Sequence, residues 1–248
     1  MRYFIELSYN GTDYHGWQVQ PNAITVQSIL DKALSILLKK PTTTMGAGRT
    51  DTGVHAAKMV AHFDFNTSID LDDLTYKLNS FLPKDIAVHQ IQQVNDDAHA
   101  RFDATQRTYF YKISTVKDVF NVDGAYYYNK NLDIDLMNKA SILLLEYSDF
   151  QCFSRAHSDV KTYLCAISEA HWTKEKHTVL FKITADRFLR NMVRAIVGTL
   201  LDVGNHKTSL KEFQKIIQSK DRSNAGASAP AKGLYLSEII YPDSIFRV

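Results

Sequence analysis

Hydrophobic and polar side chains alternate at the start of the chain, where Tyr3, Ile5, Leu7 and Tyr9 occupy every second position of a predicted β-strand. Thr25 then precedes apolar residues at helical spacing, which predicts that it caps a helix. The same patterns predict strands at residues 42–46, 58–65 and 86–94 and a helix at residues 71–81. The resulting order, β-α-β-β-α-β, is typical of a ferredoxin-like unit.

The second half of the chain repeats this mixture of strands and helices. Its clearest helix covers residues 189–201, where an unbroken apolar stripe runs along one face. The other predicted elements are strands at residues 107–113, 162–173, 179–185 and 234–240 and helices at residues 134–145 and 209–218. We therefore predict an α+β protein with two ferredoxin-like or RRM-like halves, residues 1–104 and 105–248, that share a largely antiparallel central sheet. A catalytic cleft is expected between the halves.

The composition is that of an ordinary globular protein, with 248 residues of which 45% are hydrophobic and 23% charged. Two cysteines without a Cys-x-x-Cys pair predict neither a disulfide framework nor a zinc site. Glu6 interrupts the N-terminal apolar residues and no long apolar run follows, so we expect a cytoplasmic protein without membrane association. The net charge of +2 does not by itself indicate a nucleic-acid partner, so any such site must come from local arrangement.

The most unusual segment covers residues 46–56, which hold three glycines within eight positions and lie between two predicted strands. Glycines allow the backbone to approach a ligand closely or to adopt a positive φ, and loops on a rigid scaffold commonly carry catalytic groups. Arg49 lies two positions before Asp51 and is expected to keep that carboxylate ionised. An ionised, oriented aspartate acts as a nucleophile or as a general base.

Two other interpretations of this loop remain open from the residues alone. One is a surface turn in which Arg49 and Asp51 form an ion pair without a catalytic role. The other is an aspartic protease, because Asp51, Thr52 and Gly53 spell the short signature of that class. The flanking residues disfavour the protease, since they are polar where such a site requires an apolar strand, and Arg49 would oppose the sharing of a proton between two carboxylates.

Residues 48–56 resemble the catalytic motif of the TruA family of tRNA pseudouridine synthases, with eight matched positions among nine. That family more often has alanine at the position of Thr52, so the protease-like spelling carries little weight. Four more blocks resemble family motifs in the same order along the chain, at residues 14–20 with 25–27, 107–111, 188–194 and 229–236. The resemblance therefore extends over nearly the whole chain.

This resemblance implies an isomerase that converts uridine to pseudouridine at positions 38, 39 and 40 in the anticodon arm of tRNA, and that works as a homodimer. The bond from uracil N1 to the sugar breaks, the base rotates, and C5 bonds to the same sugar carbon. Because nothing is oxidised or added, no cofactor is expected. The target base has to flip out of its stem to be reached.

The resemblance also implies roles for individual residues. Asp51 is the expected catalytic carboxylate, which either adds to the sugar or base or removes a sugar proton. Tyr109 is expected to stack on the uracil and to serve the proton transfer at C5. Arg49 or Arg190 is expected to orient Asp51 and to fill the space that the flipped base leaves.

Further residues are predicted to bind the substrate. Arg107 and Tyr109 share one face of a predicted strand, which suits a phosphate contact beside a stacked base. Arg190 and Arg194 are expected four residues apart on a helix, opposite its apolar stripe, where they would face a carboxylate or an RNA backbone. The remaining predicted substrate contacts are His55 and Gln18.

No metal is predicted, because the strand spacing of His55 and His62 and the lack of a further carboxylate cluster make a poor ligand set. Two hypotheses of other classes are an RNA-binding module that has lost catalysis and a hydrolase that uses the Asp-Thr-Gly segment. The intact Arg-Thr-Asp sequence at residues 49–51 disfavours the first.

Overall fold

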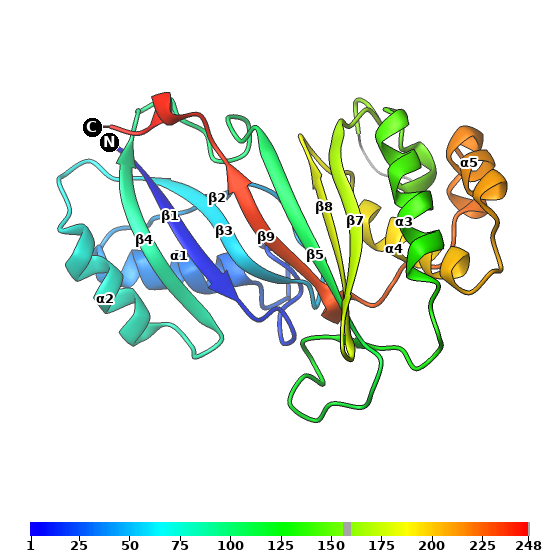
Figure 1. Ribbon diagram of the computed structural model, residues 1–248. Helices are drawn as coiled ribbons and strands as arrows, with labels where there is room; N and C mark the ends of the chain where they lie inside the picture. Colours follow the sequence, from blue (N-terminus) through cyan, green and yellow to red (C-terminus); the bar gives the residue numbers. More distant parts are fainter. Residues whose placement is uncertain (156–159, 248) are drawn as a thin grey trace. The chain divides into compact units, whose positions relative to one another are not determined.

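The computed structural model describes residues 1–155 and 160–247. The chain forms two compact units, one made of Met1–Gln106 with Tyr235–Val248 and the other of Arg107–Leu234. In Figure 1 the first unit carries the blue to teal colours together with the red C-terminal strand. The predicted division between residues 104 and 105 lies close to the first change of unit, whereas the final strand returns to the first unit instead of completing the second half.

The first unit has the ferredoxin-like order β-α-β-β-α-β that the sequence predicts. Its elements are β1 (Arg2–Tyr9), α1 (Val26–Leu37), β2 (Met45–Gly46), β3 (His55–Asp64), α2 (Leu71–Phe81) and β4 (Ile86–Val94). The central strand β1 pairs antiparallel with both β3 and β4. β2 pairs antiparallel with β3, and β9 (Leu234–Ile240) runs parallel to the first residues of β3.

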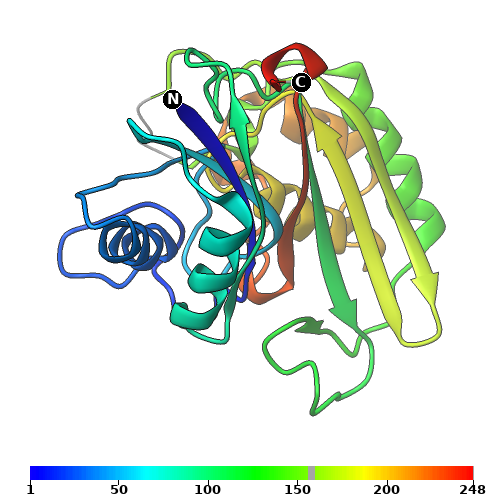
Figure 2. The same ribbon diagram turned by 90° about the vertical axis from the view of Figure 1, so that its left-hand side faces the viewer.

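Helices α1 and α2 lie on the same face of this sheet (Figure 2). Thr25 caps α1 through a reciprocal capping box with Ser28, as its position before the apolar run predicts. The core of the unit contains the alternating side chains of β1 together with apolar residues of α1, including Ile5, Leu7 and Leu30, all fully buried. Burial of each such side chain contributes about 1.5–3 kcal/mol of transfer free energy, which holds the helices on the sheet.

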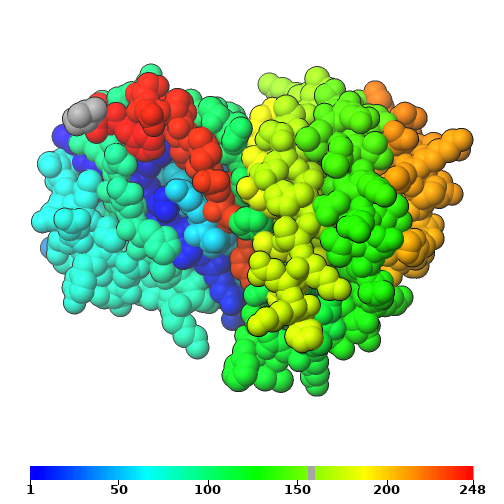
Figure 3. Space-filling model, viewed as in Figure 1, coloured from blue at the N-terminus to red at the C-terminus, as the bar shows by residue number. Residues whose placement is uncertain are grey.

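The other face of the same sheet carries a hollow of about 370 Å³. Phe4 and Val60 line it from the strands, and Tyr241 and Phe246 line it from the C-terminal segment. The ring of Phe4 meets the rings of Tyr241 and Phe246 edge-on, at centroid distances of 5.1 and 6.4 Å. Figure 3 shows the C-terminal residues in red on the surface of this unit, beside the strands that they partly cover.

The second unit is built on β5 (Gln106–Ser114), β8 (Thr178–Ala185) and β7 (Ile167–Glu175), which pair antiparallel in that order. The short strand β6 (Tyr126–Tyr127) runs parallel to β5. Its helices are α3 (Ile134–Leu143), α4 (Met192–Gly204) and α5 (Leu210–Ser219), and α3 packs on β7 and on α4. The predicted α+β class with a mostly antiparallel sheet is therefore confirmed. Within the described residues, no helix has both the length and the apolar character needed to cross a membrane.

Several predicted elements have different bounds in the structure, for local reasons. The strand predicted at residues 42–46 shortens to β2, because the backbone N–H groups of Thr42 and Thr44 donate to side chains of α1 instead of to a strand. The helix predicted from residue 189 begins at Met192, because Asn191 adopts a positive φ of 65°. The helix predicted to residue 145 ends as a 3-10 turn, and the strand predicted at residues 162–173 is β7.

His62 is an ionisable side chain buried in the first unit, with an exposed fraction of 8%. Its Nδ1 accepts a hydrogen bond from the backbone N–H of Ala100 at 3.1 Å, and its ring stands edge-on to that of His99 at a centroid distance of 4.6 Å. Burial lowers the pKa of His62 to about 4, and the positive charge of Arg2 acts in the same direction. The folded protein therefore keeps this imidazole neutral.

We predict that His62 makes the folded protein less stable in mild acid. The unfolded chain binds the proton near the ordinary pKa of 6.5 and the folded chain only near 4, so the unfolding free energy falls as the pH drops through that window. The slope from this group is at most about 1.4 kcal/mol per pH unit. The variant His62→Gln keeps an acceptor for Ala100 and should flatten the slope, as measured by chemical denaturation at several pH values between about 7 and 4. Equal slopes in the two proteins would contradict this account.

Candidate active site

The glycine-rich segment connects β2 to β3 and contains a tight turn. The backbone N–H of Val54 donates to the carbonyl oxygen of Asp51 at 3.1 Å. Gly53, at the third position of this turn, has a φ of 75°, as a type II turn requires. Thr50 is buried, Asp51 is half-buried and Arg49 is exposed. The turn therefore fixes the backbone of Asp51 next to the surface.

The loop that follows β1 holds this turn through backbone hydrogen bonds. The N–H of Trp17 donates to the carbonyl oxygen of Thr50, and the N–H of Gly53 donates to that of Tyr14, both at 3.3 Å. Gly16 lies between these contacts with a φ of 84°, and a Cβ there would stand 2.3 Å from the carbonyl oxygen of Thr50. Only glycine allows the two backbones to approach this closely.

Side chains on both sides of the turn reinforce these contacts. The hydroxyl groups of Tyr9 and Thr50 share a buried hydrogen bond of 2.8 Å. The hydroxyl of Tyr14 donates to Oδ1 of Asp85, also at 2.8 Å. Burial and the hydrogen bond to Asp85 raise the pKa of Tyr14, so the phenol remains a donor. Trp17 is fully buried and its ring stacks near that of Tyr9, at a centroid distance of 6.1 Å.

His55, a predicted substrate contact, is the first residue of β3 and has an exposed fraction of only 2%. Its Nδ1 accepts a hydrogen bond from the backbone N–H of Gly11 at 3.0 Å, which places the proton of the neutral ring on Nε2. Its ring stacks on that of Tyr235 in β9 at a centroid distance of 4.6 Å. Gly11 is required here, because a Cβ would lie 2.0 Å from the carbonyl oxygen of Val54.

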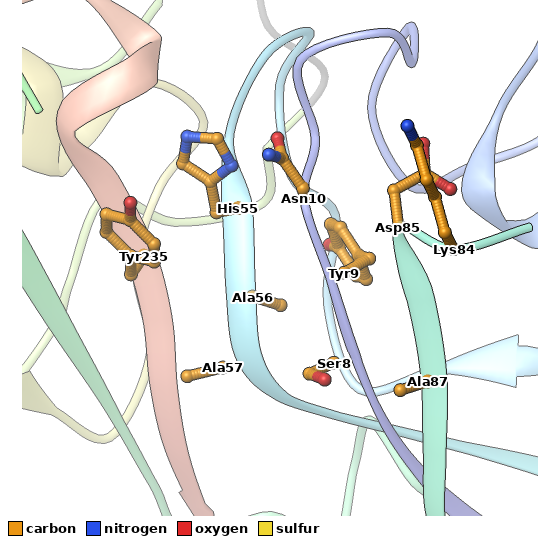
Figure 4. Close-up of a pocket in the computed structure, with 10 residues that line it drawn as sticks. All are labelled: Ser8, Tyr9, Asn10, His55, Ala56, Ala57, Lys84, Asp85, Ala87 and Tyr235. Atoms are coloured by element: carbon orange, nitrogen blue, oxygen red, sulfur yellow. The ribbon is translucent and has the colours of Figure 1, made fainter. Parts of the chain in front are cut away.

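A pocket of about 340 Å³ opens beside the turn and is bounded by β1, β3, β4 and β9. Figure 4 shows small side chains along the strands, with the rings of His55 and Tyr235 on one side, Lys84 and Asp85 on the other, and Tyr9 and Asn10 between them. We call it the alanine pocket, and define it by Ser8, Asn10, His55, Ala57, Lys84, Ala87 and Tyr235.

A β-bulge turns side chains of β3 toward the alanine pocket. Between two consecutive pairs with β1, strand β3 contributes two residues where β1 contributes one. Met59 is fully buried, and in a regular strand Ala57 would point to the same side. The extra residue reverses the side to which Ala57 points. Ala56 is therefore buried, with an exposed fraction of 3%, whereas Ala57 is exposed. The irregular pairing therefore creates the open floor that a regular sheet would lack.

Two predicted site residues of the second unit lie together on β5. Arg107 and Tyr109 are two positions apart and both half-buried, as expected for one strand face. Nη1 of Arg107 donates to the carbonyl oxygen of Asp186 at 2.8 Å. The ring of Tyr109 meets that of Phe188 edge-on at a centroid distance of 5.1 Å. The connection from β8 to α4 thus holds both side chains.

The predicted helical pairing of Arg190 with Arg194 is wrong. Because α4 begins at Met192 and Asn191 has left-handed backbone geometry, Arg190 precedes the helix and is not one helical turn from Arg194. Arg190 is exposed. Arg194 lies in the first turn of α4, where its Nε donates to the carbonyl oxygen of Ala229 at 2.8 Å. The apolar stripe was a true helix signal, but it did not reveal the break before Met192.

The structure therefore places the predicted residues in two groups. In the first unit, Arg49 and Asp51 lie on the connection from β2 to β3, and His55 begins β3. Gln18 is exposed on the loop after β1, which holds that connection. The other four residues, Arg107, Tyr109, Arg190 and Arg194, belong to the second unit. The shared catalytic cleft stays a prediction.

Sequence reasoning did not identify the residues that support the Asp51 turn. Tyr9 and Asp85 were compatible with ordinary core or surface positions, whereas Tyr14 and Thr50 lay within blocks that resemble family motifs but were given no supporting role. Along residues 1–155 and 160–247, no three or more histidine, cysteine, aspartate or glutamate side chains are grouped so as to hold a metal ion.

Comparison with known proteins identifies the family. A family model described as tRNA pseudouridine synthase matches residues 7–103 and 142–242. The chain belongs to the tRNA pseudouridine synthase family. A tRNA pseudouridine synthase A of Bacteroides fragilis is 55% identical to it, over 99% of this chain and 98% of that relative. A relative with the same name from Bacteroides thetaiotaomicron is 54% identical, over 99% of this chain and 92% of that relative. One from Bacillus subtilis is 42% identical, over 97% of this chain and 99% of that relative.

The match confirms the resemblance and the pseudouridine synthase fold. Arg49, Asp51 and His55 lie within the first matched range, while Arg107 and Tyr109 lie between the two ranges. A solved CRISPR endoribonuclease bound to RNA covers 82% of this chain and 97% of its own, but at 9% identity and a TM-score of 0.23 it supports no inference.

We predict that Gly16→Ala destabilises the folded protein, whereas Gly48→Ala in the same site does not. Gly16 combines a positive φ with a close approach to Thr50, but a Cβ at Gly48 would meet no atom within 4 Å. The expected loss of unfolding free energy for Gly16→Ala is about 1–3 kcal/mol. Urea denaturation of both variants measures it. Similar losses in the two would show that the approach to Thr50 is not the cause.

Proposed function

We propose that this chain isomerises uridine to pseudouridine in tRNA, at positions 38, 39 and 40 of the anticodon arm. The family match and the names of the relatives support the reaction and the substrate class. The observation that carries the proposal is the Asp51 turn, because the family's catalytic motif coincides with a backbone that three glycines and the loop after β1 hold in one conformation. A carboxylate needs this preorganisation to act on one atom of a bound nucleotide.

The reaction requires no outside oxidant or reductant. The bond between N1 and the sugar breaks, C5 bonds to the same sugar carbon, C5 loses its proton, and N1 gains one. Asp51 either bonds to the sugar or base, or removes a sugar proton and later returns it. All atoms of the uridine remain in the product, so we propose that the enzyme works without a cofactor.

The other predicted site residues have proposed roles around this carboxylate. Tyr109 stacks on the uracil and serves the proton transfer at C5, and Arg49 or Arg190 orients Asp51. Arg107 and Arg194 contact phosphates. These contacts offset the cost of flipping the target base from its stem, which is a few kcal/mol.

His55 and Gln18 are proposed to contact the substrate next to the turn. Backbone groups already orient His55, which supports a binding role because a preordered ring loses less entropy when RNA binds. We further propose that the enzyme acts as a cytoplasmic homodimer, with one tRNA lying across both subunits.

We predict that wild-type protein, with no added cofactor, converts uridine at positions 38, 39 and 40 of unmodified tRNA transcripts, and that Asp51→Asn lowers the rate by roughly a thousandfold or more. Release of tritium from transcripts labelled at C5 measures the reaction. Asp72→Asn, which neutralises an exposed carboxylate on α2, should react at the wild-type rate. Product at the wild-type rate from Asp51→Asn would sink the assignment. Tight tRNA binding without product from the wild type would favour a binding module instead.

We also predict that the hydrogen bond between Tyr14 and Asp85 positions the Asp51 turn. Tyr14→Phe should lower kcat by about tenfold with little change in KM, because the turn loses one support but no substrate contact. The double variant Asp85→Asn/Tyr14→Phe should lose no more kcat than the more damaging of the two single variants, because both substitutions remove the same hydrogen bond. Tyr76→Phe on α2, where the hydroxyl is exposed, is the matched control. Fully additive losses would argue against a shared role.

A further inference from the structure

The start of α4 departs from the helix that its sequence predicts. The apolar stripe begins at residue 189, but Asn191 has a φ of 65° and the helix begins only at Met192. A left-handed backbone is unfavourable for residues other than glycine, although asparagine tolerates it better than most. If Asn191 took ordinary helical geometry, α4 would extend backwards and Arg190 would lie one helical turn from Arg194. A specific interaction is therefore needed to hold Asn191 in its observed conformation.

The side chain of Asn191 bonds away from the helix. It makes no capping hydrogen bond to α4, and its Nδ2 instead donates to Oγ of Ser228 at 2.7 Å. The same oxygen accepts a second hydrogen bond from Nη2 of Arg222 at 3.0 Å. Nη1 of Arg222 donates to the carbonyl oxygens of Ala225 and Gly226, at 3.2 and 3.1 Å. One half-buried guanidinium thus fixes both the hydroxyl group that Asn191 uses and the backbone that leads to it.

Residues 222–229, which we call the clamp segment, lie against the backbone of α4. In Figure 1 this part of the chain follows α5 and returns past α4 toward β9. The backbone N–H of Ala229 donates to the carbonyl oxygen of Arg194 at 2.9 Å. A Cβ at Gly198 would stand 1.7 Å from the carbonyl oxygen of Ala227, so only glycine allows the two backbones to approach this closely. These contacts fix the clamp segment on α4 independently of Asn191.

The backbone on both sides of Arg190 is also held. Its carbonyl oxygen accepts a hydrogen bond from the backbone N–H of Arg155 at 3.0 Å, and the preceding Leu189 is buried, with an exposed fraction of 5%. The Cα–Cβ bond of Arg190 therefore points in one direction, and its side chain is exposed. The left-handed residue decides this direction, because a helical Asn191 would rotate Arg190 onto the surface of α4.

We propose that Ser228 is a positioning residue for the isomerisation of uridine. Held by Arg222, it keeps Asn191 left-handed and thereby fixes the direction in which Arg190 leaves the backbone. This inference rests on the proposed function, and it assigns the orientation of Asp51 to Arg190. In this role Ser228 acts through Asn191 and Arg190 and not on the substrate. Loss of its hydroxyl group should therefore lower the rate of the chemical step and leave tRNA binding nearly unchanged.

The first test removes and restores the hydroxyl group. Ser228→Ala should lower kcat about tenfold with little change in KM, whereas Ser228→Thr keeps the hydroxyl group and should retain most of the wild-type kcat. Ser223→Ala removes an exposed hydroxyl group from the same clamp segment and should react at the wild-type rate. Conversion of uridine in a tRNA transcript measures the rates. A wild-type kcat for Ser228→Ala would overturn the inference.

The second test asks whether Ser228 acts through Arg190. Arg190→Ala should lower kcat at least as much as Ser228→Ala does. The double variant should be no slower than Arg190→Ala alone, because the side chain that Ser228 positions is already absent. A purely structural role for Ser228 would instead lower kcat further in the double variant, and that additive loss would overturn the inference.

A crystal structure of Ser228→Ala gives a readout that does not depend on activity. We expect Asn191 to have a negative φ and α4 to begin before Met192, whereas an unchanged positive φ would overturn the inference. If Ser228→Ala does not fold, Asn191→Ala removes the other partner of the same hydrogen bond and serves for both tests.

The outcomes also separate this inference from the proposed function. Wild-type protein that forms pseudouridine, together with additive losses for Ser228→Ala and Arg190→Ala, would overturn the role of Ser228 and leave the proposed function intact. No pseudouridine from the wild type with any transcript would remove the proposed function and this inference with it.

Discussion

The close approach of two loop backbones at the Asp51 turn is the constraint on which the candidate active site depends. Three glycines make it possible: Gly11 and Gly16 because a Cβ would collide with carbonyl groups of the opposite loop, and Gly53 because of its positive φ within the turn. Hydrogen bonds between backbone groups then hold the two loops together. The carboxylate of Asp51 is thus presented by main chain that has little freedom to move, which suits a residue that must act on one atom.

A few polar side chains connect the two loops of the site to the strands of the sheet. Tyr9 is the last residue of β1 and bonds to Thr50, and Asp85 immediately precedes β4 and bonds to Tyr14. The central strand β1 and its neighbour β4, which lies at the edge of the sheet, therefore anchor the two loops of the site. The buried core and the site share one framework, because the same β1 carries core residues on one face and Ser8 of the alanine pocket on the other.

Two arginines of the second unit are held by carbonyl oxygens of the main chain. Arg107 donates to Asp186 and Arg194 to Ala229, which orients each guanidinium before any substrate is bound. A near-neutral protein can still bind a polyanion through a few oriented cations, since affinity for phosphates depends on local contacts more than on total charge.

The sequence by itself determined the secondary structure of the first unit and the family. These elements could be predicted because their signals lie in residues close together in the sequence. The signals are the period-two alternation, the capping residue Thr25 and the apolar stripes. It also singled out the segment around Asp51, because a polar loop with several glycines between two strands is unusual. Only the tertiary structure decided why those glycines are needed, since the atoms that a Cβ would meet belong to residues distant in the sequence. The bulge that turns Ala57 outward, the break before α4 and the return of β9 to the first unit were likewise set by pairing and packing between distant segments, which no local pattern encodes.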